Sequence, residues 1–230
     1  MKLKNIRVRM FRNILDSGDV SVQPDVTCLV GKNESGKTAF LQALWRLNPA
    51  RTKPTFSIPD HYPAWLEKRH RVDGIDVDDV EPIDVVYSWD QRDRDLIEKK
   101  FGKNVAPTER DITISKTYKN EIRWRHHRDE KSALKNLLSS QTLPKEISDS
   151  CRAAKTFEDL RATIVAAKKA HADNQKVVAA LQSLETLVKE KVGDKDFGTA
   201  LWSLLAARLP AYFYFADYSK LPDTAKIDRI

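Results

Sequence analysis

The residues with the clearest chemical potential run from Gly31 to Thr38, which read Gly-Lys-Asn-Glu-Ser-Gly-Lys-Thr and match the pattern G-x-x-x-x-G-K-[ST]. A loop of this kind wraps a polyphosphate so closely that its backbone N–H groups point at the phosphate oxygens. Gly31 and Gly36 permit that turn, because a side chain there would demand unusual backbone angles or fill space that the phosphates need. Lys37 supplies a positive charge for the β and γ phosphates, and the Thr38 hydroxyl is a ligand for Mg²⁺. We therefore expect the loop to bind ATP with Mg²⁺.

The segments on either side of the loop predict the elements that must position it. Residues 26–30 form a short apolar run suited to a buried strand, which would enclose Cys28. The run after the loop has helical spacing, with one apolar side made of Phe40, Leu41, Leu44 and Trp45. A helix that begins at the loop turns its unpaired N–H groups and the positive end of its dipole toward the phosphates. The alternative is an ordinary turn between a strand and a helix.

Length and composition set the outer limits. A chain of 230 residues with 41% hydrophobic and 32% charged residues is typical of one large globular domain, or of one domain with an insertion. No apolar run approaches the roughly 20 residues that cross a bilayer, and the first residues lack the apolar core of a signal peptide. The sequence therefore predicts a cytoplasmic protein without membrane association. Cys28 and Cys151 are the only cysteines, too few for a disulfide framework, and we interpret both as ordinary thiols.

The positive charge of the chain suits a polyanionic partner. The formal net charge is +7 and the isoelectric point is about 9.3, which indicates either DNA binding or a solvated basic surface. Residues 123–128 (Arg-Trp-Arg-His-His-Arg) are the best local candidate for DNA contact, and residues 68–71 (Lys-Arg-His-Arg) are the second. Alternation along a strand would place Trp124 opposite its arginine neighbours, so that Trp124 is equally well explained as a core residue.

The residues before the loop predict an antiparallel β element. Lys2 to Met10 alternates between apolar and charged residues, as a half-exposed strand does. Phe11-Arg12-Asn13 follows, and residues 16–19 are turn material ahead of a second alternating run at residues 20–22. We expect a β-hairpin directly ahead of the glycine loop.

This order resembles a known group. It is similar to the amino-terminal lobe of ABC-type ATPases of the RecF, structural-maintenance-of-chromosomes and OLD (overcoming lysogenization defect) kind, within the AAA family of P-loop ATPases. The similarity lies in the order of the parts: a strand, Phe-Arg-Asn, a hairpin, a second strand and Gly-Lys-Asn-Glu-Ser-Gly-Lys-Thr. Within the general loop pattern, that group prefers the residues Gly-x-Asn-x-Ser-Gly-Lys-Thr. The resemblance implies an α/β P-loop NTPase fold, an ABC-type head lobe with an antiparallel β layer and a helical insertion that is either coiled coil or packed on the core.

The resemblance also adds residues to the expected site. It implies that Arg12 and Asn13 lie near the nucleotide, although Arg12 could equally be a surface charge at the end of a strand. No catalytic residue is assigned, and Thr38 is the metal ligand. The complete set expected to bind the nucleotide is Arg12, Asn13, Gly31, Lys32, Asn33, Glu34, Ser35, Gly36, Lys37, Thr38 and Ala39.

The rest of the chain predicts a β-rich block followed by helices. We expect a proline-rich loop at 49–63, strands at 83–89, 112–118 and 122–125, and a short helix at 95–101 that stops at Gly102. Further on, we expect helices at 132–139, from Thr156 to about Gly193, and at 199–209; the polar stretch 168–176 is either an exposed part of the long helical run or a break in it. The predicted domains are an ATP-binding lobe at 1–130, a helical insertion at 131–209 and a returning core strand within 210–230.

Motifs that complete an ABC-type head are missing after Thr38. Residues 211–217 imitate a Walker B strand that ends in Asp217, but Tyr218 follows where such ATPases have a glutamate. We expect an incomplete head that needs a carboxy-terminal lobe from the same or a separate chain, hydrolyses ATP poorly alone and forms an ATP-dependent homodimer when intact. DNA repair, chromosome handling and nuclease-coupled phage defence are the expected settings. A nucleotide-regulated interaction module is the first alternative, and a small-molecule kinase is the second.

Overall fold

The strands of the protein form one six-stranded sheet, and all of them lie between Lys2 and Arg125 in the described chain. The computed structural model describes residues 1–106, 111–126 and 129–215. The strand order is β2-β1-β4-β5-β6, and β3 pairs with β1 as well. Two compact units are present among the described residues: 1–3, 86–113 and 124–209 form a helical unit, and 4–85, 114–123 and 210–215 form a loop-bearing unit. The domain division expected from the sequence stays a prediction.

Strand β1 (Lys2–Phe11) begins the sheet and confirms the alternation at residues 2–10. Its apolar positions Ile6, Val8 and Phe11 are buried. Strands β2 (Ile14–Asp16) and β3 (Val20–Ser21) return antiparallel to β1. The predicted hairpin ahead of the glycine loop is therefore present.

The strand expected at residues 26–30 is wrong. This segment belongs to no strand, Val26 and Val30 are 72% and 93% exposed, and the thiol of Cys28 is exposed as well. A strand is stable only when a neighbour pairs its N–H and C=O groups. Within the described chain, no strand of the sheet pairs with this segment.

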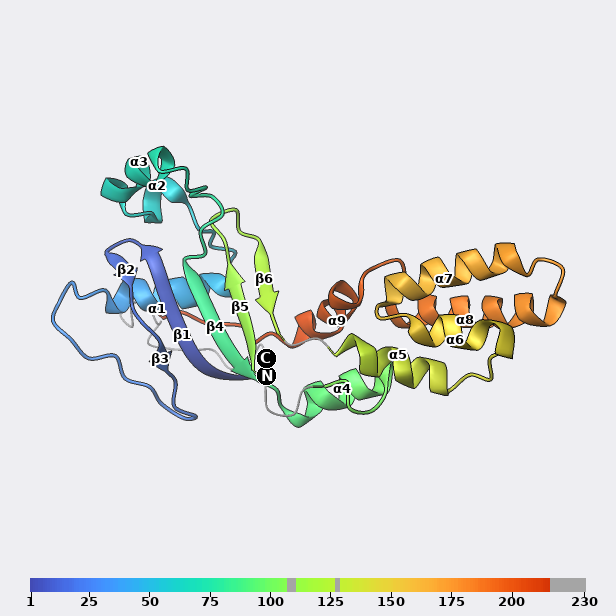
Figure 1. Ribbon diagram of the computed structural model, residues 1–230. Helices are drawn as coiled ribbons and strands as arrows, with labels where there is room; N and C mark the ends of the chain where they lie inside the picture. Colours follow the sequence, from blue (N-terminus) through green and yellow to red (C-terminus); the bar gives the residue numbers. More distant parts are fainter. Residues whose placement is uncertain (107–110, 127–128, 216–230) are drawn as a thin grey trace, which may run out of the picture. The chain divides into compact units, whose positions relative to one another are not determined.

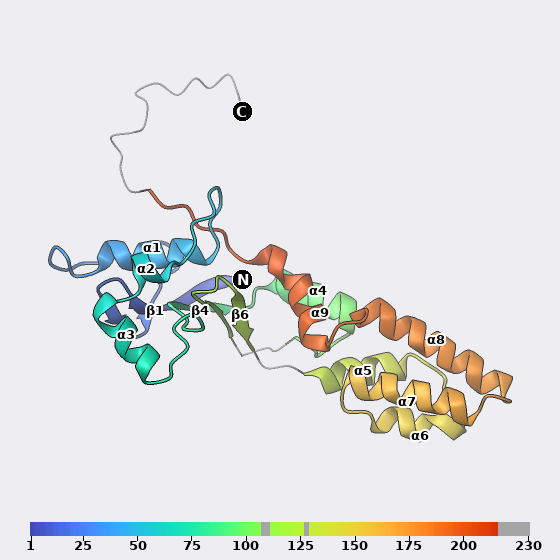
Figure 2. The ribbon, with the colours of Figure 1, turned by 90° about the horizontal axis from the view of Figure 1, so that it is seen from above.

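Helix α1 (Lys37–Leu47) begins directly at the glycine loop, as predicted, and lies against one face of the sheet (Figures 1 and 2). The side of the helix that faces the core differs from the expected one, because Leu41 is 44% exposed. The buried side instead consists of Ala39, Phe40, Ala43 and Leu47. Small alanines at two of these positions let the helix approach the sheet closely.

The proline-rich segment contains a helix that the sequence did not predict. Helix α2 (Ile58–His61) tolerates Pro59 because its first turn has no use for that N–H group. Helix α3 (Ala64–Val72) follows it and was not predicted from the sequence either. Tyr62 between them is buried, and it packs against Tyr118 with ring centroids 5.3 Å apart.

The remaining strands agree with the sequence. They are β4 (Ile83–Ser88), β5 (Ile112–Lys116) and β6 (Ile122–Arg125). Asn120 has a positive φ of 64° between β5 and β6, and its side chain bonds to the backbone of Phe56. This double contact fastens the hairpin to the segment that leads into α2.

Six helices and a short 3₁₀ turn make up most of the described helical unit. They are α4 (Gln91–Phe101), α5 (Glu130–Ser139), α6 (Lys145–Ala153), α7 (Phe157–Ala170), α8 (Gln175–Val192), α9 (Phe197–Leu205) and the turn Ala206–Arg208. All but α6 were predicted in some form. The long helical pattern does break, at residues 171–174, and α7 and α8 pack side by side (Figure 1).

Most helices of this unit are closed at their amino-terminal ends by their own side chains. In α7, Thr156 accepts from the N–H of Asp159 while the Asp159 carboxylate accepts from the N–H of Thr156, which is a capping box. The other helices with a side-chain cap are α4, α5, α8 and α9, with caps Asp90, Asp129, Asn174 and Asp196.

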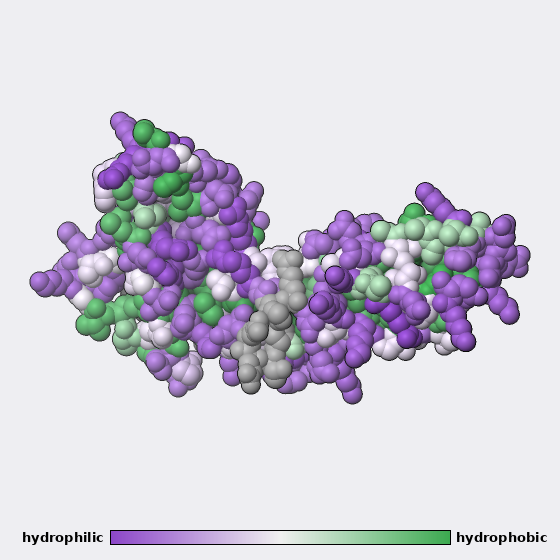
Figure 3. Space-filling model, in the orientation of Figure 1, coloured by the Kyte–Doolittle hydropathy of each residue, from purple (hydrophilic) through white to green (hydrophobic). Residues whose placement is uncertain are grey.

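Hydrophilic residues cover most of the face seen in Figure 3.

The core strand expected after Pro210 is wrong for the part that is described. Only Tyr212 forms a bridge, with Pro49, while Phe213 and Phe215 are 58% and 71% exposed. Asp217, the imitation of a Walker B acid, lies outside the described residues. In the described part of the chain, no helix combines the length and the apolar character that crossing a membrane requires.

Candidate nucleotide-binding site

A cavity of about 420 Å³ opens where the glycine loop meets α1 and the end of β1. Eight of the eleven expected residues line it, namely Arg12, Asn13, Asn33, Glu34, Gly36, Lys37, Thr38 and Ala39. The other three, Gly31, Lys32 and Ser35, hold the side chain of Lys37. The structure therefore brings the two residues of the Phe-Arg-Asn motif to the loop, as the resemblance implied.

The backbone of the loop needs the glycine at position 36. Gly36 has a φ of 94°, a conformation that residues with a side chain rarely adopt. A Cβ atom there would lie 3.0 Å from Cγ1 of Ile14. Glu34 also has a positive φ, of 64°. These two residues produce the tight bend that sends the chain into α1.

Helix α1 begins without a side-chain cap, because Gly36 occupies the cap position. The first N–H groups of a helix need an acceptor, and a bound anion is an effective one. The positive end of the helix dipole favours the same anion. The exposed Thr38 follows one residue after the start of this helix and lines the cavity.

The ammonium group of Lys37 lies over the loop. Its Nζ donates to the carbonyl oxygens of Gly31 and Lys32, at 2.7 and 2.6 Å, and lies 3.4 Å from Oγ of Ser35. A lysine held against the loop in this way is positioned to meet the oxygens of a phosphate chain that the loop surrounds.

The end of β1 is fastened to the loop and to α2. Nδ2 of Asn13 donates to the carbonyl oxygen of Glu34 at 2.7 Å. The N–H of Arg12 donates to the carbonyl oxygen of His61 at 2.5 Å, and Arg12 has a strained φ of 55°. The guanidinium of Arg12 bonds to Oε1 of Gln42 on α1. Arg12 is therefore an exposed residue at the end of β1 whose backbone and side chain are held beside the cavity, and its role toward the nucleotide stays a prediction.

Positive charge accumulates beside this cavity, and within the described chain neither Arg12 nor Arg46 forms an ion pair. The guanidinium groups of Arg12 and Arg46 both lie over the ring of Phe11, at 5.6 and 5.7 Å from its centroid. Burial lowers the pKa of Arg46, and the charge of Arg12 lowers it further. Burial likewise lowers the pKa of His61, with added effects from both arginines. A region where cations depress each other's pKa values favours the binding of an anion.

Gln42, Arg46 and His61 were not predicted from the sequence; they contact Arg12 or its neighbours but are not among the residues that line the cavity. Gln42 and Arg46 are four residues apart on α1, and Nη1 of Arg46 donates to the carbonyl oxygen of Gln42 at 3.0 Å. Helical spacing from Thr38 was the available signal for both, because they follow it by four and eight residues. His61 gave no signal, because its position depends on the unpredicted helix α2.

The residues present fit ATP with Mg²⁺. The loop, the uncapped start of α1 and Lys37 together offer N–H groups and a cation for a polyphosphate. Thr38 would be the residue that holds the metal, with an oxygen ligand of the kind that Mg²⁺ takes. The bound ion would neutralise charge on the terminal phosphates.

The two clusters considered for DNA are largely engaged within the protein. Arg123 forms an ion pair with Asp79 at 2.5 Å. The ring of Trp124 stacks on His126 and on Trp202, with centroids 4.3 and 5.3 Å away. Residues 127 and 128 lie outside the described residues.

The second cluster is similar. Arg71 pairs with Glu67 at 3.1 Å, and Arg69 lies 3.8 Å from Asp73. Of this cluster, Lys68 is exposed and makes no ion pair with a described residue.

A glycine loop that opens an uncapped helix, with a lysine folded over it, defines the class of P-loop nucleotide-binding proteins. A family model described as "AAA ATPase domain" matches residues 1–216, and the chain belongs to this family. Membership supports ATP binding, typically with Mg²⁺. A search of curated proteins finds no match.

Proposed function

We propose that this chain is the ATP-binding lobe of an ABC-type ATPase of the RecF, structural-maintenance-of-chromosomes and OLD kind, which acts with DNA. The observation that carries the proposal is the cavity in which Arg12 and Asn13 join the glycine loop. The hydrogen bond from Asn13 to the Glu34 carbonyl ties the Phe-Arg-Asn motif to the loop itself. Repair, chromosome handling and nuclease-coupled phage defence are the settings that suit such an ATPase.

In this proposal the described residues bind and orient the nucleotide. Lys37 and the N–H groups at the start of α1 hold the β and γ phosphates, and Thr38 holds Mg²⁺. Arg12 adds a second cation, directed by its bond to Gln42. None of these groups is a base that activates water, so hydrolysis depends on residues from a complementary lobe.

Two exposed apolar segments support the idea of a complementary lobe. Residues 26–30 have the composition of a strand but no neighbour, and Phe213 and Phe215 are exposed in the segment that follows α9. Extended apolar backbone without a partner readily accepts a strand from another polypeptide. We propose that the second lobe covers these segments and that ATP promotes association of two such heads.

Calorimetry with ATP, ADP and GTP in the presence of Mg²⁺ tests the nucleotide part of the proposal. We expect saturable ATP binding by the wild type and a loss of about 100-fold in affinity for Lys37→Ala, because a charge-assisted contact to phosphate disappears. Lys53→Ala is the matched control, since Lys53 is an exposed lysine of the same unit. Folded wild-type protein that fails to bind, or equal affinities for the wild type and Lys37→Ala, would contradict the proposal.

DNA association is tested separately by fluorescence anisotropy at two salt concentrations. We expect an affinity that falls by at least tenfold between about 50 and about 200 mM salt, as counterion release requires. Lys68→Ala is the informative variant, with Lys53→Ala again as its control. Salt-independent binding, or none, would remove DNA from the proposal and leave ATP binding intact.

A further inference from the structure

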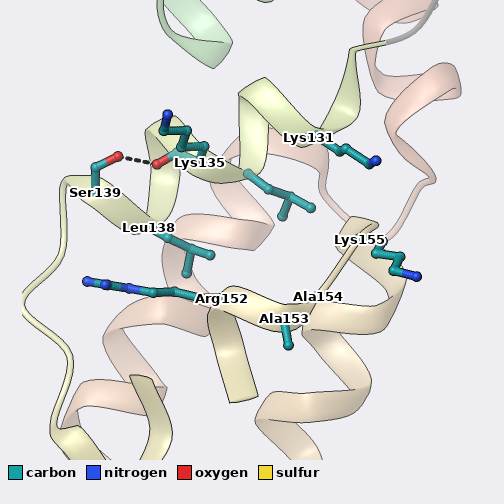
Figure 4. Close-up of a pocket in the computed structure, with 9 residues that line it drawn as sticks. Lys131, Lys135, Leu138, Ser139, Arg152, Ala153, Ala154 and Lys155 are labelled. Carbon is teal, nitrogen blue, oxygen red and sulfur yellow. Dashed lines mark hydrogen bonds between the residues drawn. The ribbon is translucent and has the colours of Figure 1, made fainter. Parts of the chain in front are cut away.

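A second cavity, of about 540 Å³, lies within the helical unit between α5, the end of α6 and the link to α7 (Figure 4). We call it the cationic groove. The residues that line it are Lys131, Leu134, Lys135, Leu138, Ser139, Arg152, Ala153, Ala154 and Lys155. None of them belongs to the nucleotide site, and none of them was predicted from the sequence to be a functional residue.

Four cations line the cationic groove, and no acid is among the described residues that do. Lys131 and Lys135 are one helical turn apart on α5, while Arg152 and Lys155 come from the opposite wall. All four side chains belong to exposed residues. Within the described chain, none of the four makes an ion pair. Four like charges around one cavity repel one another unless an anionic ligand is bound.

Three acids close in sequence to the groove bond to backbone groups. Asp129 caps α5 by accepting from the N–H of Ser132 at 3.0 Å. Oε1 of Glu130 accepts from the N–H of Phe157 at 2.7 Å. Asp159 accepts from the N–H groups of Lys155 and Thr156. Each of these three carboxylates therefore accepts a backbone N–H at the start of a helix.

The floor of the cationic groove is apolar and tightly packed. Leu134 and Leu138 are 2% and 5% exposed, and Ala153 and Ala154 leave the space between the helices open. In Figure 4, Lys131 and Lys155 extend to the same side, whereas Arg152 extends past Leu138 to the other. A ligand that fills this cavity meets cations at both ends and methyl groups between them.

We propose that the cationic groove binds an acidic peptide segment of a partner protein, with carboxylates at both ends and one or two apolar side chains between them. Several separated carboxylates match four separated cations better than a single anionic group does. An apolar side chain gains free energy on the leucine and alanine floor, which offers nucleic acid no aromatic ring for stacking. This inference does not depend on the proposed ATPase function.

Fluorescence anisotropy with the full chain tests the groove. The probe is a labelled peptide of about twelve residues in which glutamates flank two leucines at helical spacing. Its comparison probes are the same peptide with lysines for glutamates, and a labelled oligo(dT). We expect the acidic peptide to bind, the basic peptide not to bind, and the oligonucleotide to bind more weakly than the acidic peptide.

The matched variants are Lys131→Gln with Arg152→Gln, and Lys169→Gln with Lys176→Gln. Lys169 and Lys176 are exposed residues of α7 and α8 outside the groove, so both pairs remove the same charge. We expect the first pair to weaken acidic-peptide binding about tenfold or more and the second pair to change it less than twofold. Ala153→Phe, which narrows the cavity without a change of charge, should also weaken binding.

Circular dichroism and unchanged calorimetric ATP binding establish that each variant is folded. Absence of peptide binding by the wild type, equal losses in the two pairs of variants, or tighter binding of oligo(dT) would each overturn the inference. Loss of ATP binding by the Lys37→Ala protein with peptide binding retained would show that the two sites are independent.

Discussion

The starts of the helices differ between the two units of the chain. In the helical unit, α4, α5, α7, α8 and α9 each use a side chain of the protein as the acceptor for their first N–H groups. Helix α6 of the helical unit has no such bond, and neither do α1, α2 and α3 in the loop-bearing unit. Among these uncapped helices of the described chain, α1 is the one whose first residues line the cavity of the glycine loop, so its first N–H groups are available to an anion.

A second difference concerns the backbone between elements. A helix satisfies most of its own hydrogen bonds, so the helical unit is complete once its faces pack. A strand depends on neighbours, and residues 26–30 lack them within the described chain. The helical unit therefore forms most of its hydrogen bonds within its own helices, whereas the loop-bearing unit leaves residues 26–30 without a paired strand in the described chain.

The largest effect that would sharpen this comparison comes from Gly36→Ala. We expect it to abolish measurable ATP binding and to lower the free energy of unfolding by about 2 kcal/mol, because the new Cβ meets Ile14 and the φ of 94° becomes strained. Calorimetry and denaturant unfolding measure the two effects.

Gly74→Ala is the control for that variant. Gly74 also has a positive φ, of 80°, but a Cβ there meets nothing within 4 Å. We expect a cost of about 1 kcal/mol in stability from backbone strain alone, with ATP affinity unchanged. Equal losses of affinity in both variants would show that Gly36 has no special part in the site.

A moderate effect is expected from the capping residue of α7. Thr156→Ala should lower the free energy of unfolding by about 1 kcal/mol, because the N–H of Asp159 loses its acceptor. ATP affinity should not change. Thr186→Ala is the control, since the hydroxyl of Thr186 bonds only to the carbonyl of Gln182 within α8. A stability loss as large for Thr186→Ala would mean that the cap contributes nothing specific.

The smallest effect is expected from the pH dependence of stability at His61. Burial, Arg46 and Arg12 lower the pKa of His61 from its ordinary value of 6.5, while Asp60 and the bond from Ser57 raise it. The unfolded state therefore binds more protons as the pH falls through 6.5, and the folded state loses stability there. Denaturant unfolding from about pH 8 to about pH 5.5 measures the loss.

The variant His61→Gln removes the titrating group and should flatten this dependence. His171→Gln, in the helical unit, is the control and should keep the wild-type slope. An identical slope in the wild type and His61→Gln would show that protonation of His61 is not linked to folding.

The sequence predicted most of what depends on local chemistry. The glycine loop, the start of α1, the alternation of β1 and the caps of α7 follow from residue types within a few positions of each other. The cavity residues were also anticipated, although Arg12 and Asn13 came from a family resemblance rather than from spacing. Local signals suffice where a residue and its partner are close in the chain.

The errors fall where structure depends on distant partners. Residues 26–30 look like a strand, yet no described neighbour pairs with them, and composition alone cannot reveal that. Leu41 was predicted on the buried side of α1 because it is apolar. In the structure Ala39 and Ala43 are buried there instead, and their small side chains permit closer packing. The cationic groove has no signal in the sequence, because its walls come from two separate segments, 131–139 and 152–155.

The strained end of β1 has a consequence for any chimera of this protein. Met10 and Arg12 both have a positive φ, and they flank the fully buried Phe11. The hydroxyl of Tyr118 donates to the carbonyl of Met10, and the carbonyl of His61 accepts from Arg12. If residues 1–38 were grafted onto a foreign scaffold, the hydrogen bonds with Tyr118 and His61 would be lost, and the positive-φ backbone at Met10 and Arg12 would relax. The Phe-Arg-Asn motif is therefore transplantable only together with the hairpin and the short helix that hold it.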